Sequence, residues 1–339
     1  MVTGPEFAVI GGETVQDVLS GRHAEVMSVV EDAYRTHAAG ETVNPPSYFL
    51  RFPDRPRSRI IALPASLGGE AAVDGMKWIS SFPDNLEAGL PRASAVLILN
   101  DPRTGFPLAC LESSVISATR TAASAVLAAA KLHEGRSRPR RVAFVGSGLI
   151  ARYIHTFLRA TEWEFEEVGV FDLADEYAAA FERYLSANGV GQTRIHPSAE
   201  SAIRESDLIV FATTAARPHV HDLSWFAHNP TVLHVSLRDL APEIILGSTN
   251  VLDDVDHCLK ADTSPHLAEQ LTGSRDFVHG VLADVLRGDF VPAVDRPLVF
   301  SPFGLGVLDL AVGRFVYDSA VAAGRLHTVP GFFHELSRY

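Results

Sequence analysis

The stretch Arg140–Ala151 constrains the fold of this chain most, because a short apolar run ends there in the pattern Gly-x-Gly-x-x-Ala. Val142–Val145 is apolar without alternation, which is typical of a strand covered on both faces of a parallel sheet. Gly146 permits a tight turn, Gly148 lets backbone approach a pyrophosphate, and Ala151 keeps the next helix close to the strand. The first amides of that helix attract a phosphate. The stretch therefore predicts the phosphate-binding turn of a dinucleotide fold.

The residues that follow the turn fit this prediction. Residues 149–160 are compatible with a helix, and Glu167–Phe171 with a second strand. Asp172 ends that strand about 20 to 25 residues after the glycines, where a dinucleotide fold places its ribose-binding acid. A carboxylate there repels the 2′-phosphate of NADP, and Leu173 and Ala174 supply no arginine to offset the repulsion. The sequence therefore favours NAD over NADP.

Strands and helices continue to alternate up to about residue 236. The buried strand Asp207–Ala212 ends in Thr213 and Thr214, and the strand Thr231–Ser236 runs into the loop 236–239. Ligands of such sheets gather at the carboxyl ends of the strands. These two loops are therefore expected to lie on one rim with the Gly146 turn.

The chain before residue 134 has a different sequence pattern from the cofactor domain. Between residues 44 and 100, short β-type runs separated by Pro and Gly predict an antiparallel sheet, and residues 115–133 form an Ala-rich helix candidate. Lys77 lies within one of the apolar strands, and periodicity alone favours a solvent-facing side chain over a functional pocket. Arg120 lies near the start of the helix, where the helix dipole disfavours a cation; it is either functional or simply solvated.

Ser301–Asp309 leads into a long helix, reaching about Ala323, that stands outside the alternation of strands and helices. If this helix returns to the first domain, that domain is discontinuous. We therefore expect an α/β protein in which a Rossmann-type NAD-binding domain, residues 134–300, is inserted in an α+β domain formed by residues 1–133 and 301–339.

Composition excludes several classes of function. A net charge of −12 argues against a nucleic-acid or anionic-membrane partner. Two cysteines, no secretory segment and no apolar run of the roughly 20 residues that a membrane span needs make the cytoplasm the expected location. His219 and His221 alternate as strand residues do, but no further ligand cluster completes a site, so we expect no metal.

Several segments, taken in order, resemble the ornithine cyclodeaminase/μ-crystallin family over nearly the whole chain. They are Gly75-Met76-Lys77, Phe82-Pro83-Asp84-Asn85, Thr119-Arg120-Thr121-Ala122-Ala123, the Gly146 turn and Gly304-Leu305-Gly306. Within the family, the siderophore-type N-(2-amino-2-carboxyethyl)-L-glutamate dehydrogenases are most similar. Cyclodeaminases usually carry N-x-x-G-G-D where this chain has His234–Asp239, in which the aspartate matches but the glycines do not.

The resemblance implies roles for particular residues. Lys77 and Asp239 would be catalytic, and Arg120 would bind a substrate carboxylate. Arg51 would be the second carboxylate-binding arginine, with Arg59 as a rival. The expected cofactor-binding residues are Gly146, Ser147, Gly148, Leu149, Ile150, Asp172, Thr213, Thr214, Ser236, Leu237 and Gly304.

The resemblance also implies a reaction. NAD-dependent oxidation of N-(2-amino-2-carboxyethyl)-L-glutamate, followed by Schiff-base hydrolysis, would yield L-2,3-diaminopropionate and 2-oxoglutarate for a siderophore or antibiotic. Two alternatives stay open: an ornithine cyclodeaminase that forms proline and ammonia, and a μ-crystallin-like ketimine reductase or NADPH-binding protein. The expected partners are a small amino-acid conjugate as substrate and a second copy of the chain. A β-rich first domain with an exposed edge suggests a homodimer, which the family also implies, so that domain would serve both substrate binding and dimerisation.

Overall fold

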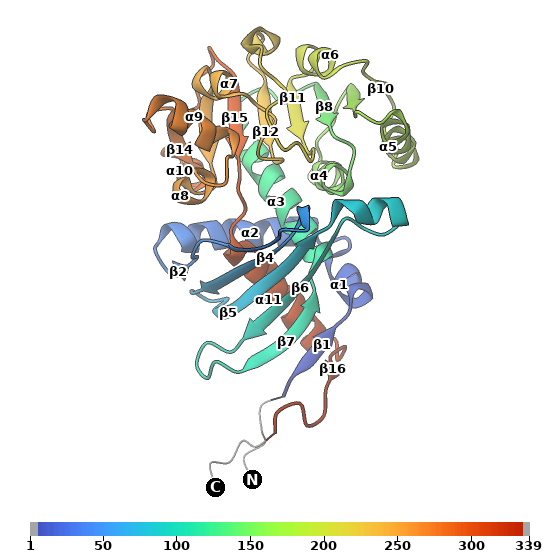
Figure 1. Ribbon diagram of the computed structural model, residues 1–339, viewed down its shortest axis with the longest axis vertical. Helices are drawn as coiled ribbons and strands as arrows, with labels where there is room; N and C mark the ends of the chain where they lie inside the picture. Colours follow the sequence, from blue (N-terminus) through green and yellow to red (C-terminus); the bar gives the residue numbers. More distant parts are fainter. Residues whose placement is uncertain (1–5, 335–339) are drawn as a thin grey trace. The chain divides into compact units, whose positions relative to one another are not determined.

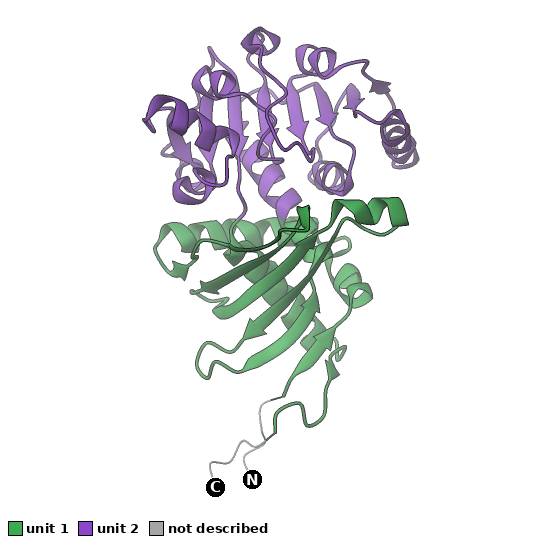
Figure 2. Cartoon of the chain, in the orientation of Figure 1, with its two compact units in different colours: residues 1–120, 305–339 green, residues 121–304 purple. Residues whose placement is uncertain are grey.

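The computed structural model describes residues 6–334, which form two compact units. Unit 1 takes in the chain up to Arg120 and from Leu305 onward, and unit 2 comprises Thr121–Gly304 (Figure 2). The sequence places the first boundary after residue 133, at the end of a helix, whereas the units divide inside that helix. Its C-terminal end is tied to unit 2, since Nε2 of His133 lies 2.9 Å from Oγ1 of Thr231. Residues 1–5 and 335–339 of the expected first domain lie outside the described residues.

Unit 1 is built on an 8-stranded sheet with the order β16-β1-β7-β6-β5-β4-β2, in which β3 also pairs with β4 (Figure 1). Its strands are β1 (Ala8–Ile10), β2 (Thr42–Val43), β3 (Tyr48–Phe52), β4 (Arg55–Leu67), β5 (Val73–Ser81), β6 (Ala93–Asn100), β7 (Pro107–Glu112) and β16 (His327–Thr328). The strands β3 to β7 pair antiparallel, as the sequence predicts. The helical segments of this part of the chain are α1 (Gly12–Leu19), α2 (His23–Ala38), η1 (Pro83–Ala88), the start of α3 (Ser114–Leu132) and α11 (Gly306–Ala322).

The register of this sheet decides which side chains face the core. Leu63, Lys77 and Leu97 stand directly opposite one another on β4, β5 and β6, so their side chains share one face. Helix α11 packs on that face so closely that a Cβ on Gly313 would lie 2.1 Å from Cδ2 of Leu97. The neighbouring row, which includes Trp78, points to the opposite face.

Unit 2 is built on a second 8-stranded sheet, with the order β10-β9-β8-β11-β12-β15-β13-β14 (Figure 1). Every pairing in it is parallel. The strands are β8 (Arg141–Val145), β9 (Glu167–Phe171), β10 (Thr193–Ile195), β11 (Leu208–Phe211), β12 (Thr231–His234), β13 (Thr249–Leu252), β14 (Val278–Val281) and β15 (Leu298–Ser301). The helices are α4 (Leu149–Ala160), α5 (Asp175–Ala187), α6 (Ala199–Arg204), η2 (Leu223–Phe226), α7 (Pro242–Leu246), α8 (Val255–Cys258), α9 (Ser264–Thr272) and α10 (Leu282–Arg287). This arrangement is the predicted Rossmann-type sheet.

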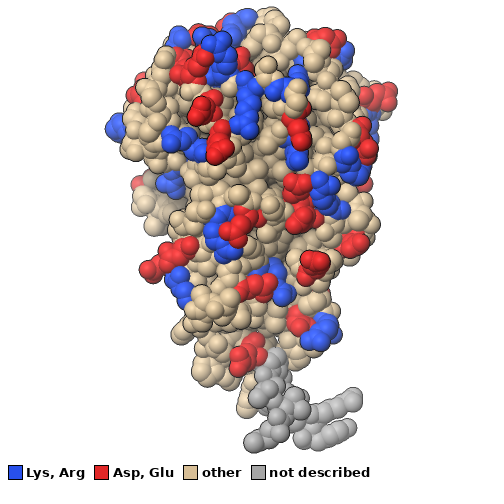
Figure 3. Space-filling view, turned by 180° about the vertical axis from the view of Figure 1, so that it is seen from behind, with Lys and Arg blue, Asp and Glu red and all other residues tan. Residues whose placement is uncertain are grey.

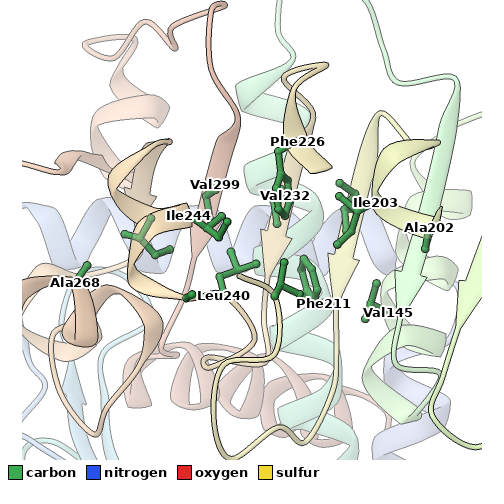
Figure 4. Packing of buried hydrophobic residues seen from close by; sticks show 14 of the residues in the cluster. Val145, Ala202, Ile203, Phe211, Phe226, Val232, Leu240, Ile244, Ala268 and Val299 are labelled. Carbon is green, nitrogen blue, oxygen red and sulfur yellow. The ribbon is translucent and has the colours of Figure 1, made fainter. Parts of the chain in front are cut away.

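Apolar side chains from neighbouring strands form the core on one face of this sheet (Figure 4). Phe211, Val232 and Val299 of the central strands β11, β12 and β15 are each 0% exposed. Ile203 of α6 and Ile244 of α7 pack against them, also at 0% exposure. The core therefore fixes the central strands whose carboxyl ends carry the predicted cofactor residues.

Helix α3 is long and apolar enough to cross a membrane by length and composition alone, but 67% of its apolar window is buried inside the protein. Burial of this kind is typical of the core helix of a soluble protein. On the face shown in Figure 3, acidic and basic side chains are interspersed rather than gathered into a single basic patch. A surface of this kind offers no continuous track for a polyanion.

Candidate functional site

The turn between β8 and α4 has the geometry that a bound phosphate requires. Gly146 adopts φ of +90°, and a Cβ there would lie 2.7 Å from the carbonyl oxygen of Ala212. Gly148 caps the N-terminus of α4, and a Cβ on Gly148 would meet nothing within 4 Å. Open space therefore faces the first amides of a helix of 12 residues. Leu149 and Ile150 begin that helix.

Asp172 lies directly after β9 and is fixed beside this turn. Its Oδ2 accepts hydrogen bonds from the backbone N of Ser147 at 2.9 Å and from the Ser147 hydroxyl at 2.7 Å. Its Oδ1 accepts from the backbone N of Ala174 at 3.1 Å. Leu173 is 95% exposed and supplies no positive charge. The carboxylate thus occupies the strand end at which ribose hydroxyls bind in this fold.

The remaining predicted cofactor residues follow three adjacent strands of the same parallel sheet. Thr213 and Thr214 follow β11, Ser236 and Leu237 follow β12, and Gly304 follows β15. Parallel strands end at one edge, so these loops share the edge with the Gly146 turn. The structure therefore groups the predicted residues, while their contact with a nucleotide stays a prediction.

Asp239 lies at this edge but is fully enclosed, with a side chain 0% exposed. The hydroxyls of Thr213 and Ser236 donate to its carboxylate. Nε2 of His219 lies 3.0 Å from Oδ1, and Nε2 of His234 lies 3.3 Å from Oδ2. Burial raises the pKa of Asp239, but its contacts with His219, His234 and Ser236 outweigh that effect and hold the pKa well below its usual range. Asp239 is therefore a buried anion.

Lys77 is buried, at 2% exposure, which excludes the solvent-facing alternative. Its Nζ donates to Oδ2 of Asp309 at 2.7 Å and to the hydroxyl of Ser117 at 3.1 Å. Nε of Arg120, whose side chain is 11% exposed, donates to Oδ1 of the same aspartate at 3.1 Å. We call Lys77, Asp309, Arg120 and Ser117 the lysine cluster; all four belong to unit 1.

The lysine cluster changes the acidity of its lysine. Burial lowers the pKa of Lys77, the charge of Asp309 raises it, and the charge of Arg120 lowers it again, which leaves the pKa at about 8 instead of 10.5. A lysine with this pKa is partly neutral near physiological pH and can accept a proton. The cluster therefore combines a base with an arginine of the kind that binds carboxylates.

Our sequence reasoning missed Asp309, which lies 232 residues from Lys77 along the chain. A local signal was present, because Asp309 is a lone acid between Leu308 and Leu310 at the start of an apolar helix. A carboxylate in such surroundings needs a charged partner. That signal predicts a buried ion pair, but it does not name the partner.

The two rival arginines, Arg51 and Arg59, stand opposite each other on β3 and β4, and Arg59 stands opposite Ser81 of β5. Arg92, which the sequence analysis missed, donates to the hydroxyl of Ser81 at 2.8 Å. Within residues 6–334, no carboxylate forms an ion pair with Arg51 or Arg92. Ser81 lies on the same face of β5 as Lys77, ~13 Å along the strand. A second group of arginines therefore shares the face that carries the lysine cluster.

The described part of the chain holds no group of three or more His, Cys, Asp or Glu side chains placed to bind a metal ion. Fold and site together define an α/β protein with a dinucleotide-binding turn on a parallel sheet and a buried lysine cluster in a second, mainly antiparallel unit.

The chain belongs to the ornithine cyclodeaminase/mu-crystallin family, which it matches over residues 13–324. It is 29% identical to N-((2S)-2-amino-2-carboxyethyl)-L-glutamate dehydrogenase of Staphylococcus aureus, over 88% of this chain and 91% of that protein. It is also 29% identical to alanine dehydrogenase of Archaeoglobus fulgidus, over 94% of this chain and 96% of that protein. The solved structure of an archaeal alanine dehydrogenase dimer with bound NAD has 27% identity and a TM-score of 0.84, and covers 96% of this chain and 100% of that one. The family predicted from the sequence is thus confirmed.

Proposed function

We propose that this protein cleaves N-(2-amino-2-carboxyethyl)-L-glutamate oxidatively to L-2,3-diaminopropionate and 2-oxoglutarate. The protein is an NAD-dependent dehydrogenase of its family that acts on a C–N bond. The observation that carries the proposed substrate is the lysine cluster, in which one buried carboxylate holds both a base and a carboxylate-binding arginine. A diamino acid product suits the biosynthesis of a siderophore or antibiotic.

The residues of unit 2 fit NAD as the cofactor. Open space at Gly148 faces the amides of α4, and Asp172 is fixed at the strand end where ribose hydroxyls bind in folds of this type. The Asp172 carboxylate also disfavours the extra phosphate of NADP. When bound, NAD supplies the acceptor for the hydride that leaves the glutamyl α-carbon.

Lys77 supplies the base that this oxidation needs. Hydride leaves the α-carbon only when the substrate nitrogen holds a free electron pair, so a proton must first pass from that nitrogen to neutral Lys77. With a pKa of about 8, Lys77 is neutral in a useful fraction of molecules. Oxidation leaves a C=N bond, and addition of water at its carbon then releases 2-oxoglutarate and the primary amine of 2,3-diaminopropionate.

The arginines distinguish this substrate from alanine, which has a single carboxylate. The conjugate carries three carboxylates, and the face that holds Lys77 also carries Arg120, Arg51 and Arg92. The planar guanidinium binds a carboxylate through two parallel hydrogen bonds. A protein of net charge −12 thus presents local positive charge to an anionic substrate.

We also propose that the protein is a cytoplasmic homodimer. The related archaeal alanine dehydrogenase is a dimer. The sheet of unit 1 leaves one apolar face exposed, with Tyr48 at 70% and Trp78 at 39% exposure. A second copy of the chain would cover such a face.

The test is a product analysis with purified protein, NAD and the conjugate. We expect NADH and 2-oxoglutarate in equal amounts, and NADH without the keto acid would contradict the hydrolytic half. A Lys77→Met variant tests the role of the lysine at nearly unchanged side-chain volume. Its turnover should be lower by about 100-fold or more, because the substitution removes an acid–base group.

Two competing substrates and a binding measurement with NADPH make the same assay decisive. NADH and pyruvate from L-alanine, with no reaction of the conjugate, would identify an alanine dehydrogenase, which the 29% identity to the Archaeoglobus enzyme makes the main rival. Conversion of ornithine to proline without net NADH would identify a cyclodeaminase. Tight NADPH binding without turnover of the conjugate would identify a ketimine reductase-like protein.

A further inference from the structure

His219 is the exposed member of the group around Asp239. It lies in the loop after β11, and its side chain is 38% exposed, whereas those of Asp239 and His234 are 0% exposed. The backbone N atoms of His219 and Val220 both donate to the carbonyl oxygen of Asp239 at 3.0 Å. Backbone and side chain therefore fix His219 at the carboxyl edge of the parallel sheet, where ligands of this fold bind.

The charge of Asp239 decides which nitrogen of His219 carries the proton. The pKa of Asp239 is held well below its usual range, so its carboxylate only accepts hydrogen bonds. Nε2 of His219, 3.0 Å from Oδ1, must therefore be the N–H donor. In the neutral ring this leaves the lone pair on Nδ1, and within residues 6–334 no hydrogen-bond partner contacts that atom. A partly exposed imidazole with a free lone pair has the form of a general base.

The rest of the group holds Asp239 in place. The backbone N–H of Asp239 donates to Nε2 of His234 at 3.2 Å, and Nδ1 of His234 lies 3.2 Å from the hydroxyl of Ser301. The hydroxyls of Thr213 and Ser236 donate to the carboxylate itself. A buried carboxylate with this many partners cannot turn toward a ligand. Of its side-chain partners, the His219 ring is the exposed one. The pair resembles catalytic groups in which an aspartate orients a histidine base.

We propose that His219 is the base of the hydrolytic half of the reaction and that Asp239 is the residue that positions it. This assignment rests on the proposed function and divides the two proton transfers between Lys77, for oxidation, and His219, for hydrolysis. It makes Asp239 a positioning residue, where the family resemblance implied a catalytic one.

Hydrolysis consumes one water molecule and leaves His219 unchanged. The oxygen of a water molecule bonds to the imine carbon while one of its protons passes to Nδ1 of His219, and the imine nitrogen gains a proton. The C–N bond then breaks as the new hydroxyl loses its proton and the nitrogen gains a second one. The water oxygen ends in the carbonyl of 2-oxoglutarate, both protons end on the primary amine, and His219 returns to its neutral form.

A His219→Gln variant tests this proposal, because its amide can still donate to Asp239 but cannot act as a base. In rapid mixing with NAD and the conjugate, we expect a burst of about one NADH per site at a rate near that of the unchanged protein. Release of 2-oxoglutarate should then be slower by about 100-fold. Asp239→Asn should show the same pattern, and added imidazole should partly restore turnover to His219→Ala.

The neighbouring exposed His221 is the matched control, and His221→Gln should behave as the unchanged protein. A His219→Gln steady-state rate within twofold of the unchanged protein would overturn the proposal. Loss of the NADH burst in parallel with turnover would also overturn it, because it would place His219 in oxidation or folding. If the unchanged protein forms no NADH from the conjugate, the proposed function itself fails, which is a separate result.

Discussion

At the scale of single residues, two charged neighbours shift the pKa of Lys77 in opposite directions. Asp309 favours the charged lysine, and Arg120 and burial favour the neutral one. Neither neighbour is exposed enough for water to screen it, since their side chains are 0% and 11% exposed. A buried lysine of this kind keeps a pKa suited to proton transfer only while both neighbours remain.

We therefore predict that the oxidation rate rises with pH through an apparent pKa of about 8, because neutral Lys77 is the active form. Asp309→Asn should move this rise to lower pH, since it removes the charge that raises the pKa of Lys77. Arg120→Gln should move it to higher pH for the opposite reason. The measurement is kcat against pH at saturating substrate, with thermal melts to verify folding. Shifts in the same direction in both variants would contradict the assignment of the base to Lys77.

At the scale of elements, local signals were enough to predict the turn of unit 2. The strand β8, the turn at Gly146 and the helix α4 are contiguous in sequence, so each could be predicted from its own residues. The lysine cluster could not, because it depends on the register of β4, β5 and β6 and on a helix that starts at residue 306. Periodicity even favoured a solvent-facing Lys77, since strand alternation does not reveal which face α11 covers. Strands as short as β13, with 4 residues, carry too little periodicity to be predicted.

Substitution by alanine should impair NAD binding at Gly148 but destabilise the fold at Gly146. Gly148→Ala should fold normally, because φ is −79° and a Cβ meets nothing within 4 Å, but the methyl group would fill the space of the pyrophosphate. Such overpacking costs ~1–3 kcal/mol, so NAD affinity should fall by about tenfold or more. Gly146→Ala should destabilise the fold itself, since φ is +90° and the Cβ would lie 2.7 Å from a carbonyl oxygen.

Calorimetric titration with NAD and thermal unfolding separate these two effects. Gly148→Ala should lose affinity at an unchanged melting temperature, and Gly146→Ala should lose both. Unchanged NAD affinity in Gly148→Ala would remove the turn from the cofactor site.

At the scale of the whole molecule, α11 covers one face of the sheet of unit 1, while the other face leaves apolar side chains exposed among residues 6–334. Tyr48, Ala62, Trp78 and Val96 stand opposite one another across four strands and share the face away from Lys77. Tyr48 is 70% exposed, and Trp78 and Val96 are each 39% exposed. A contiguous apolar row of this kind is typical of a protein interface. The same alternation that buries Lys77 therefore exposes the surface on which we propose that a second copy packs.

We predict that replacing apolar residues of this row with aspartate breaks the proposed dimer without unfolding the protein. In a twofold-symmetric interface each substitution occurs twice, and a charge buried without a partner costs several kcal/mol. The double variant Tyr48→Asp with Val96→Asp should therefore sediment as a monomer at concentrations where the unchanged protein is a dimer. Leu271→Asp, at a position of unit 2 that is 60% exposed, is the matched control and should remain dimeric. A double variant that still sediments as a dimer would show that the subunits meet elsewhere.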